Sequence, residues 1–403
     1  MEEEGEAKAK LRVLDSVRIL DFSHVLAGPY CTRLLVDLGA EAIKVEPPPP
    51  KIELSRTGGG DLWWLSNCGK KSLCLNLTKQ KAVKIVHELV KQCDVVVENF
   101  RAGVMAKLRI GYDSLQEANP RIIMCSLSPF GQEGPYSHLP ASALVPNALS
   151  GYMWMQGKVA NPDGPPIASA FAIGDVAAAV YAAVAICSAL YFREITGIGQ
   201  HIDISLIDCL FAMLSDRAEH LLVNQQEGSK IIMGGSIAYA GKDGYITLGG
   251  LTQDQQVRLF KAMGREDLIN NPKFDCAEHR RQNIEDLRQI ITDWVKSFDS
   301  IQQVASILEK ADVIFAPVLS IWQASRHPHI VAHGMVRDVD VPKRGKVKVL
   351  NTPFRFSHTE SGLRGNFPRL GEHNNEILTS LLDYSAEELA QLREERIIYS
   401  ELS

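Results

Sequence analysis

Short apolar runs alternate with amphipathic stretches along roughly the first 130 residues. Between residues 79 and 92, the apolar residues Val83, Val86, Leu89 and Val90 recur at the spacing of one helical face. The remaining pattern predicts strands at 17–22, 42–46, 72–77, 94–97 and 122–126 and a helix at 29–38. Strands that alternate with helices are typical of a parallel sheet covered on both faces. We therefore predict an α/β fold for this part of the chain.

A Gly- and Pro-rich stretch at residues 157–166 interrupts this pattern. A long Ala-rich helix is expected at 175–194, followed by a strand at 200–204 and a helix at 206–222. The apolar run at 176–192 has 17 residues, fewer than the roughly 20 that a membrane-spanning helix needs. We therefore expect a buried core helix there.

The pattern changes again near residue 230. A hairpin is expected at 239–248, and helices are expected at 253–263, 281–298 and 301–310. The chain ends in a helix at 385–395, where Ser385 and Glu388 fit a capping box. These changes predict a large domain at residues 1–229, a small α/β domain at 230–325 and a C-terminal segment at 326–403.

Composition narrows the class of protein. The chain has 403 residues, of which 45% are hydrophobic and 23% charged, as in an ordinary globular protein of two or three folding units. The net charge is −5 and no basic block stands out, which argues against a nucleic-acid partner. The eight cysteines form no Cys-x-x-Cys pair, and the acidic N-terminus resembles neither a signal nor a transit peptide. We expect a cytoplasmic protein without a membrane partner, with the mitochondrial matrix as the alternative.

Familiar site motifs are incomplete in this sequence. His327, His329 and His333 lie close together, but no Cys or carboxylate in that stretch completes a metal site. The glycines at 58–60 lack the Lys-Ser/Thr of a phosphate loop, and Gly-x-Ser-x-Gly is absent. We therefore predict no metal, and we expect the prolines at 47–50 to form a stiff connector without a role in chemistry.

Asp175 opens the long Ala-rich helix and has two interpretations. An Asp at a helix start commonly caps backbone amides and interacts favourably with the helix dipole. Almost every residue from 168 to 192 is small or apolar, however, so this carboxylate could also be desolvated and nucleophilic toward a carbonyl. The residue pattern leaves both interpretations open.

A series of short segments resembles the class III CoA-transferase family, which includes formyl-CoA:oxalate and carnitine CoA-transferases and the alpha-methylacyl-CoA racemases. The segments occur in the family's order at 21–29, 38–46, 67–77, 97–101, 119–121, 128–136, 174–175, 196–200, 243–245 and 370–373. The resemblance covers nearly the whole chain. It implies a Rossmann-like large domain with a parallel sheet, a smaller α/β domain, a C-terminal segment that returns to the large domain, and an interlocked ring-like homodimer.

The resemblance also implies a mechanism. Asp175 stands where the family's nucleophilic aspartate lies, so it would form mixed-anhydride and aspartyl-CoA thioester intermediates. The enzyme would move CoA from a donor acyl-CoA, with succinyl-CoA as a candidate, to a small carboxylic acid. Gly234 and Gly235 are candidates for an oxyanion or lid loop. Coenzyme A and acyl-CoA would be substrates, with no permanently bound cofactor.

The same resemblance places residues that bind CoA. They are Leu26, Ala27, Leu75, Asn76, Leu77, Thr78, Asn99, Phe100, Arg101 and Lys107. A cationic side chain such as Lys107 can pair with a CoA phosphate.

Departures from the family pattern affect the choice of reaction. Leu26 replaces a glutamine of the formyl-CoA:oxalate enzyme, and Thr78 replaces its lysine, although Lys79 is adjacent. Ser142 and Ala143 occupy the positions of the racemases' catalytic His-Asp pair, so the proton shuttle of a racemase lacks its groups. CoA transfer is therefore favoured. The alternatives are an acyl-CoA racemase or epimerase of the same fold and a catalytically silent CoA-binding protein.

Overall fold

The computed structural model describes residues 11–53, 56, 63, 66–161, 163–224, 237–249, 251–341 and 345–401. The chain divides into two compact units. The larger unit comprises Met1–Gln156, Pro166–Gln226 and Ala332–Ser403, and the smaller unit comprises Gly157–Pro165 and Glu227–Val331. The domain boundaries expected from the sequence, after residues 229 and 325, stay a prediction.

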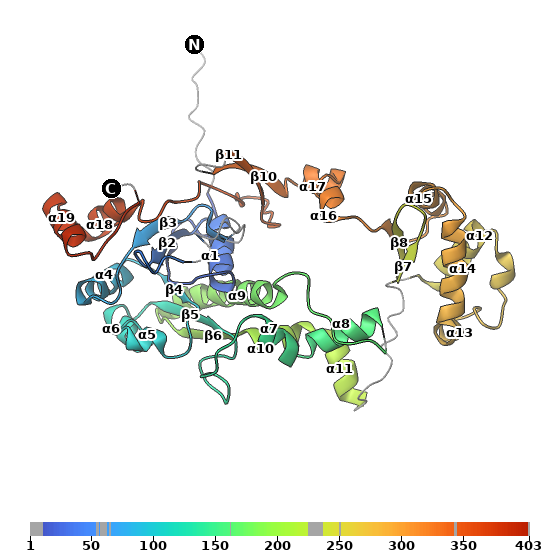
Figure 1. Ribbon diagram of the computed structural model, residues 1–403, viewed down its shortest axis with the longest axis horizontal. Helices are drawn as coiled ribbons and strands as arrows, with labels where there is room; N and C mark the ends of the chain where they lie inside the picture. The colour runs from blue at the N-terminus through green and yellow to red at the C-terminus, as the bar shows by residue number, and fades with distance from the viewer. Residues whose placement is uncertain are drawn as a thin grey trace, which may run out of the picture. The chain divides into compact units, whose positions relative to one another are not determined.

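A six-stranded parallel sheet forms the centre of the larger unit (Figure 1). Its strands are β1 (Arg18–Asp21), β2 (Glu41–Glu46), β3 (Lys71–Cys74), β4 (Val95–Glu98), β5 (Ile123–Ser128) and β6 (His201–Ser205). The spatial order is β3-β2-β1-β4-β5-β6, so the direction of winding reverses between β1 and β4. This is the doubly wound order in which ligands bind outside the carboxyl ends of the strands at the reversal point. The prediction of an α/β fold with a parallel sheet is confirmed.

Helices cover both faces of this sheet (Figure 1). Successive side chains along its strands point to opposite faces and enter two separate apolar cores. Ile19 packs with residues of α1 (Ala27–Asp37) and α9 (Ile173–Thr196). Leu20, the next residue along β1, packs in the second core with residues of α4 (Gln80–Val90), α6 (Tyr112–Ala118) and α18 (Asn374–Leu382). Adjacent strand residues point to opposite faces, which explains this division. The larger unit also contains α5 (Val104–Lys107), α7 (Leu144–Leu149), α10 (Leu206–Met213) and α11 (Ser215–Asn224).

Helix α9 is long and apolar enough to cross a membrane by length and composition, and half of its most apolar window is buried. Ala178 and Ala182 are fully buried on the side that packs against α1 and the sheet. Small side chains let the two helices approach closely. The opposite side exposes Val184 (61%), Tyr191 (72%) and Ile195 (67%). The expected burial therefore applies to one side of this helix.

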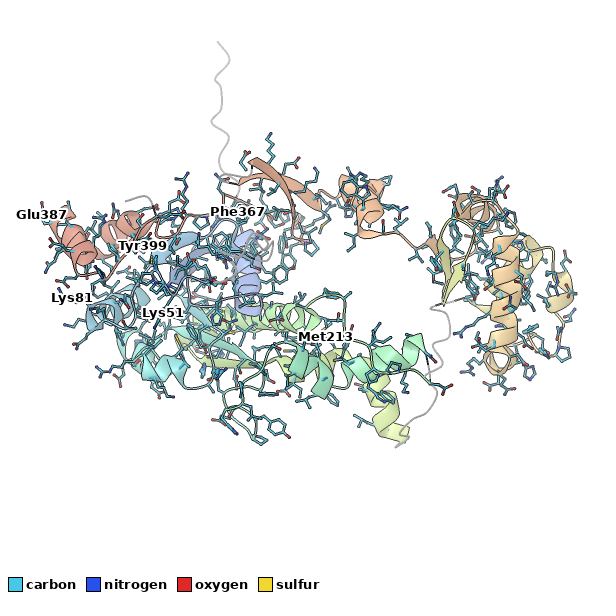
Figure 2. All side chains as sticks on the ribbon, in the orientation of Figure 1. Lys51, Lys81, Met213, Phe367, Glu387 and Tyr399 are labelled. Carbon is cyan, nitrogen blue, oxygen red and sulfur yellow. The ribbon has the colours of Figure 1, made fainter. Side chains whose placement is uncertain are left out.

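The C-terminal part of the chain packs on the β3 edge of the sheet. The Asn374 side chain accepts a 2.8 Å hydrogen bond from the Cys74 amide, and Ile398 forms an antiparallel bridge with Leu75. Helix α19 (Ala386–Glu394) begins with the predicted capping box of Ser385 and Glu388. Figure 2 shows Glu387 and Tyr399 of this region on the same side of the larger unit as Lys81. An antiparallel hairpin, β10 (Val336–Val341) and β11 (Gly345–Leu350), precedes this region and is not indicated by the apolar pattern.

The smaller unit has an antiparallel three-stranded sheet and a set of helices. Its strands are β7 (Ile237–Ala240), β8 (Tyr245–Leu248) and β9 (Phe315–Pro317), and the predicted hairpin corresponds to β7 and β8. The helices are α12 (Gln253–Ala262), η1 (Glu266–Leu268), α13 (Ala277–Gln282), α14 (Ile284–Lys296), α15 (Ile301–Lys310) and α16 (Ile321–Ala324). The helix expected at 281–298 begins at Ile284, because Asn283 ends the short α13. The chain also forms α8 (Tyr152–Ala160) and α17 (Pro328–Ala332).

Candidate active site

Asp175 lies in the first turn of α9, and α1 is packed against that helix. Burial raises the pKa of Asp175 to about 6, against hydrogen bonds from its own backbone amide and from the amide of Ala27, which lower it. Ala27 is the first residue of α1, and no side chain among the described residues caps that helix. The Asp175 carboxylate therefore interacts with the unpaired amide ends of two helices.

This environment suits a carboxylate that must react. Amides at a helix N-terminus and the helix dipole stabilise negative charge. Removal from water acts in the opposite direction and makes a carboxylate more nucleophilic. Because the pKa of Asp175 remains below 7, the carboxylate is mostly ionised at neutral pH. The group can thus attack a carbonyl carbon without prior deprotonation by a neighbouring base.

The loop between β1 and α1 is held in an unusual conformation. Val25 has a φ of 66°, in the left-handed region that is strained for a β-branched residue. Such conformations cost about 1–3 kcal/mol and persist only where the surroundings impose them. The Asn99 side chain makes two 2.8 Å hydrogen bonds to the backbone of His24, and Glu53 accepts a 2.8 Å hydrogen bond from the Val25 amide. These contacts fix the approach of the chain to Ala27.

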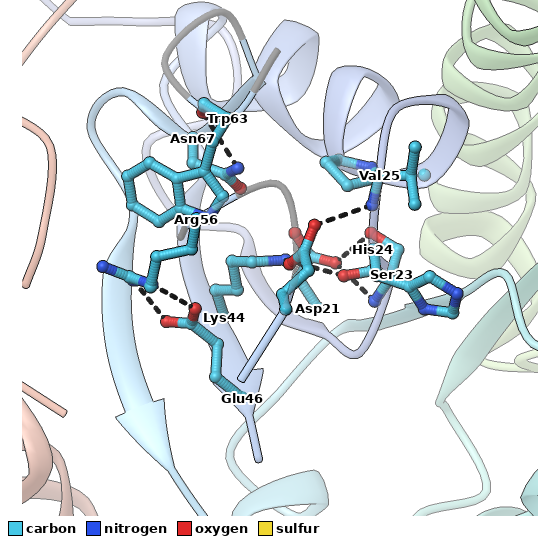
Figure 3. Close-up of polar contacts among 12 residues, drawn as sticks. Asp21, Ser23, His24, Val25, Lys44, Glu46, Arg56, Trp63 and Asn67 are labelled. Atoms are coloured by element: carbon cyan, nitrogen blue, oxygen red, sulfur yellow. Dashed lines mark hydrogen bonds and ion pairs between the residues drawn. The ribbon is translucent and has the colours of Figure 1, made fainter. Parts of the chain in front are cut away.

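A buried group of charges lies beneath this loop (Figure 3). Asp21, at the end of β1, accepts hydrogen bonds from Lys70 (2.9 Å), Thr32 (2.7 Å) and Ser23. Burial opposes ionisation of Asp21, yet Lys70 and Lys44 hold its pKa well below the usual range. Lys44 donates a 2.6 Å hydrogen bond to the Ser23 carbonyl. The loop therefore rests on a network of paired charges.

Gly28 allows α1 to begin close to this loop. A Cβ atom at this position would lie 2.3 Å from the Cβ of Ser23, which is far inside van der Waals contact. Only glycine fits without moving the loop or the helix. Glycine is required here because of the close contact and not because of the backbone conformation, since Gly28 does not have a left-handed φ.

A cavity of about 660 Å³ lies at the carboxyl ends of β1, β2, β3 and β4, next to the point where the sheet reverses. Its apolar lining includes Phe22, Val45, Leu75, Leu77, Phe100 and Leu108, and the prolines at 47–50 form another part of its wall. Polar atoms come from Asn76, Thr78, Glu46, Glu53 and Lys51. Such a cavity suits a flat aromatic or aliphatic group with a few hydrogen-bonding positions.

A second cavity of about 760 Å³ shares Leu77, Thr78 and Leu108 with the first, so the two adjoin. Its basic lining residues are Lys79, Lys84, Lys91, Lys107 and Arg109, with His87 and Glu88 also present. Cationic side chains gathered around a cavity favour phosphate groups. A ligand with one apolar part and one phosphorylated part fits the pair of cavities.

Comparison with known proteins decides the family. Residues 14–374 match the profile of CoA-transferase family III. The chain belongs to this family. It is a class III CoA-transferase, and CoA thioesters are its substrates.

Relatives of this transferase match it along nearly their whole length. It is 32% identical over 399 residues to succinyl-CoA–D-citramalate CoA-transferase of Chloroflexus aurantiacus. This match covers 96% of this chain and 98% of the relative. It is also 32% identical to human succinyl-CoA:glutarate CoA-transferase, over 95% of this chain and 89% of the relative. The crystal structure of a CAIB/BAIF family protein from Brucella suis matches with a TM-score of 0.81 and 29% identity, covering 92% of this chain and 99% of that chain.

The transferase brings six of the ten predicted CoA-binding residues to the two cavities. Leu75, Asn76, Leu77, Thr78 and Phe100 line the first cavity, and Lys107 lines the second. The prolines expected to lack a chemical role contribute to the first cavity wall, because they directly follow β2 at its carboxyl end.

The other predicted residues have different surroundings. Leu26 and Ala27 form the start of α1 and line neither cavity, while Asn99 bonds to the backbone of His24. Arg101 is exposed and also lines neither cavity. Gly234 and Gly235 lie outside the described residues. The roles of all these residues in CoA binding or catalysis stay predictions.

Two further residues of the loop and the site carry no recognisable signal in the sequence. Glu53 holds the Val25 amide, although a lone Glu after a run of prolines has no recognisable motif. Asn147 of α7 is 3% exposed, and its side-chain oxygen has no hydrogen-bond partner among the described residues. A Cβ atom on Gly174 would lie 2.8 Å from this oxygen, so Asn147 packs directly against the residue before Asp175.

Among the described residues, His327, His329 and His333 do not form a cluster of potential metal ligands. In the described part of the chain, the one cluster of potential metal ligands is Asp275, Cys276 and His279 at the start of α13. His279 and Asp275 are 2.7 Å apart and form an ordinary hydrogen bond at a helix start.

Proposed function

We propose that this transferase moves CoA from succinyl-CoA to a small carboxylic acid, with the Asp175 carboxylate as the nucleophile. The donor is supported by the relatives, whose names specify succinyl-CoA with D-citramalate or glutarate as the second substrate. The nucleophile is supported by one observation above all. The Asp175 carboxylate is partly buried in the first turn of α9, and burial raises its pKa only to about 6, which is low enough for the ionised form to predominate at pH 7.

The proposed reaction has four bond-exchange steps. An Asp175 oxygen attacks the succinyl thioester carbonyl, the C–S bond breaks, and CoA thiolate leaves a succinyl-aspartyl anhydride. The thiolate attacks the aspartyl carbonyl, which expels succinate and forms an aspartyl-CoA thioester. The acceptor carboxylate then attacks this thioester carbonyl and again expels CoA thiolate. Finally, the thiolate attacks the acceptor's carbonyl in the new anhydride, which gives the product thioester and restores the Asp175 carboxylate.

The surroundings of Asp175 would assist each step. When its carbonyl carbon is attacked, negative charge develops on a carbonyl oxygen, and a fixed amide donor stabilises that charge. The Ala27 amide, which lowers the pKa of the carboxylate, can supply such a donor. The burial that raises the pKa of Asp175 also limits hydrolysis of the anhydrides and the thioester.

The two adjoining cavities would hold CoA. The apolar cavity beyond β1–β4 suits the adenine, and the basic cavity suits the phosphates, with Lys107 and Lys79 as ligands. In this assignment Leu75–Thr78 bind CoA from the segment after β3. Gly234 and Gly235 would contribute an oxyanion or lid loop.

We further propose that two chains form an interlocked homodimer in the cytoplasm. The exposed apolar side of α9, with Val184, Tyr191 and Ile195, is a surface that a second copy would cover. The eight cysteines are free thiols, six of them buried, which suits a reducing compartment.

Trapping with hydroxylamine tests the nucleophile. The protein is incubated with succinyl-CoA and hydroxylamine, and the peptide that contains Asp175 is analysed by mass spectrometry. We expect an aspartyl hydroxamate at Asp175 that requires succinyl-CoA. Asp208 provides a matched control, because it also lies in the first turn of a helix, α10. An unmodified Asp175 peptide in protein that turns over succinyl-CoA would contradict the proposal.

A further inference from the structure

Side chains from three other segments hold successive residues of the loop that leads into α1. Lys44, on β2, donates a 2.6 Å hydrogen bond to the Ser23 carbonyl. Asn99, just after β4, bonds to both the amide and the carbonyl of His24. Glu53 accepts a 2.8 Å hydrogen bond from the amide of Val25. The position of this loop is thus imposed from outside, residue by residue.

Glu53 has a double role among these contacts. One of its carboxylate oxygens accepts the Val25 amide hydrogen, and the other lies 3.3 Å from the Lys44 ammonium group. The side chains of Glu53 and Lys44 are 9% and 1% exposed. A buried carboxylate that is paired with a cation is held firmly, because leaving either charge unpaired is costly. Glu53 therefore connects Val25 to the charge network under Ser23.

The strained backbone of Val25 makes the hydrogen bond from its amide to Glu53 important for the position of the loop. Its left-handed conformation is unfavourable for a branched side chain, so the loop would relax without an external restraint. The restraint acts two residues before Ala27, which packs in one core with Ala177 and Ala178 of α9 and whose amide lowers the pKa of Asp175. A change in direction at Val25 would therefore shift the donor that faces the nucleophile.

We propose that Glu53 is a positioning residue of the transfer reaction: by holding the strained Val25 amide, it aims the Ala27 amide at Asp175. This inference rests on the proposed function, because its effect on the reaction is exerted through Asp175. Glu53 takes no part in bond making. Its contribution is the orientation of one hydrogen-bond donor at the reacting carboxylate.

The test compares Glu53→Ala with Glu53→Gln. Alanine removes the acceptor of the Val25 amide, whereas the glutamine amide oxygen retains it. Glu41→Ala is the matched control, because Glu41 is likewise a carboxylate that joins two partners, the cations Arg18 and Lys71, but lies at the start of β2, away from the loop. Should Glu53→Ala fail to fold, Glu53→Met takes its place, since methionine has a similar length and no oxygen acceptor.

Hydrogen exchange, kinetics and rescue by the conservative variant separate positioning from simple stabilisation. Hydrogen–deuterium exchange of the peptide spanning residues 22–30, measured without substrate, is expected to accelerate in Glu53→Ala and not in Glu41→Ala. The kcat is expected to fall about 10- to 100-fold, as for a small misplacement of a catalytic donor, with KM for succinyl-CoA changed by less than about threefold. The acid limb of the kcat/KM profile is expected to move to higher pH, because loss of the Ala27 donor raises the pKa of Asp175. Glu53→Gln is expected to recover most of the kcat.

The inference is overturned if folded Glu53→Ala keeps the wild-type kcat and the wild-type acid limb. It is also overturned if only KM changes, which would make Glu53 a CoA-binding residue in the cavity that it lines. Hydroxylamine trapping separates this failure from failure of the proposed function. Trapping at Asp175 with equal rates in wild type and Glu53→Ala rejects the inference alone, whereas absence of trapping in active wild-type protein rejects the nucleophile.

Discussion

The backbone amide of Ala27, the first residue of α1, acts on the carboxylate of Asp175 in the first turn of α9 and lowers its pKa. No capping side chain among the described residues reaches this amide, so it is available as a donor to the group proposed to react. Burial of the same carboxylate raises its pKa to about 6. The ionised carboxylate therefore destabilises the folded protein, whereas a neutral side chain at this position would not. This relationship leads to the first two predictions below, on activity and stability.

The first prediction concerns removal of the carboxylate. Asp175→Asn is expected to lower kcat at least about 10³-fold, because the amide is a poor nucleophile. The same change is expected to increase the free energy of unfolding at pH 7 by on the order of 1–3 kcal/mol, since it removes a desolvated charge. Steady-state kinetics and urea denaturation measure the two effects. Asp208→Asn is the control, and a fully active Asp175→Asn enzyme would contradict the assignment.

A second prediction follows from the pKa of Asp175. The carboxylate must be ionised to attack, so kcat/KM is expected to rise with pH through an apparent pKa of about 6. Stability should change in the opposite direction. The folded-state pKa lies above the ordinary value of 3.8, so the folded protein binds more protons and loses stability as pH rises from about 4 to about 6. An acid limb near pH 4 in the kinetic profile would show that Asp175 is not the titrating nucleophile.

Glu98 supplies a third prediction, on stability alone. Burial raises its pKa to about 7, despite hydrogen bonds from Ser126 and the Phe100 amide. The raised value means that stability falls as pH increases from about 4.5 to about 7. Glu98→Gln is therefore expected to be more stable than wild type at pH 8 and similar to it at pH 4. Thermal unfolding across this range measures the difference. Equal stability of the two proteins at pH 8 would contradict the prediction.

The basic cavity leads to a fourth prediction. Lys107→Ala is expected to raise KM for succinyl-CoA about 10-fold or more with little change in kcat, since a charge-assisted hydrogen bond to phosphate is worth about 1.5–3 kcal/mol. Lys81→Ala is the matched control, because Lys81 lies on α4, pairs with Glu395 and lines neither cavity. The effect of Lys107→Ala is expected to shrink with a CoA that lacks its 3′-phosphate. An unchanged KM would place the phosphates elsewhere.

The exposed side of α9 gives a fifth prediction. Val184→Glu places a charge in the middle of the apolar surface and is expected to weaken the proposed dimer. Analytical ultracentrifugation at several protein concentrations compares it with wild type. Glu394→Lys, on α19, is the control for a change of surface charge. A wild-type protein that sediments as a monomer at every concentration would contradict the dimer.

Much of the fold could be predicted from apolar spacing. The strands of the parallel sheet are short apolar runs, and the Ser385–Glu388 capping box marks a helix start by purely local chemistry. The β10–β11 hairpin could not be predicted in this way, because the exposed charged residues Arg337, Asp338 and Asp340 separate the valines of β10. Exposed strands bury little apolar surface, so their pattern is weak.

The site depends on contacts that sequence spacing does not contain. Asp175 could be singled out, because a carboxylate among alanines is unusual. Its contact with Ala27 could not be predicted, because it depends on how α1 packs against α9. The restraint by Glu53 is equally non-local, since it joins a segment after β2 to the loop after β1. Sequence patterns report local periodicity and capping, whereas these contacts arise from tertiary packing.

Transfer of oxygen from the acceptor tests the central claim most directly. In the proposed mechanism the acceptor carboxylate leaves one of its oxygens on Asp175 when CoA thiolate attacks the second anhydride. The enzyme is allowed to turn over succinyl-CoA with glutarate, or whichever carboxylic acid it accepts, labelled with oxygen-18 in both carboxylates. The account predicts that the Asp175 peptide becomes heavier by the mass of the exchanged oxygen, while other peptides do not change. An unlabelled Asp175 after many turnovers would contradict it.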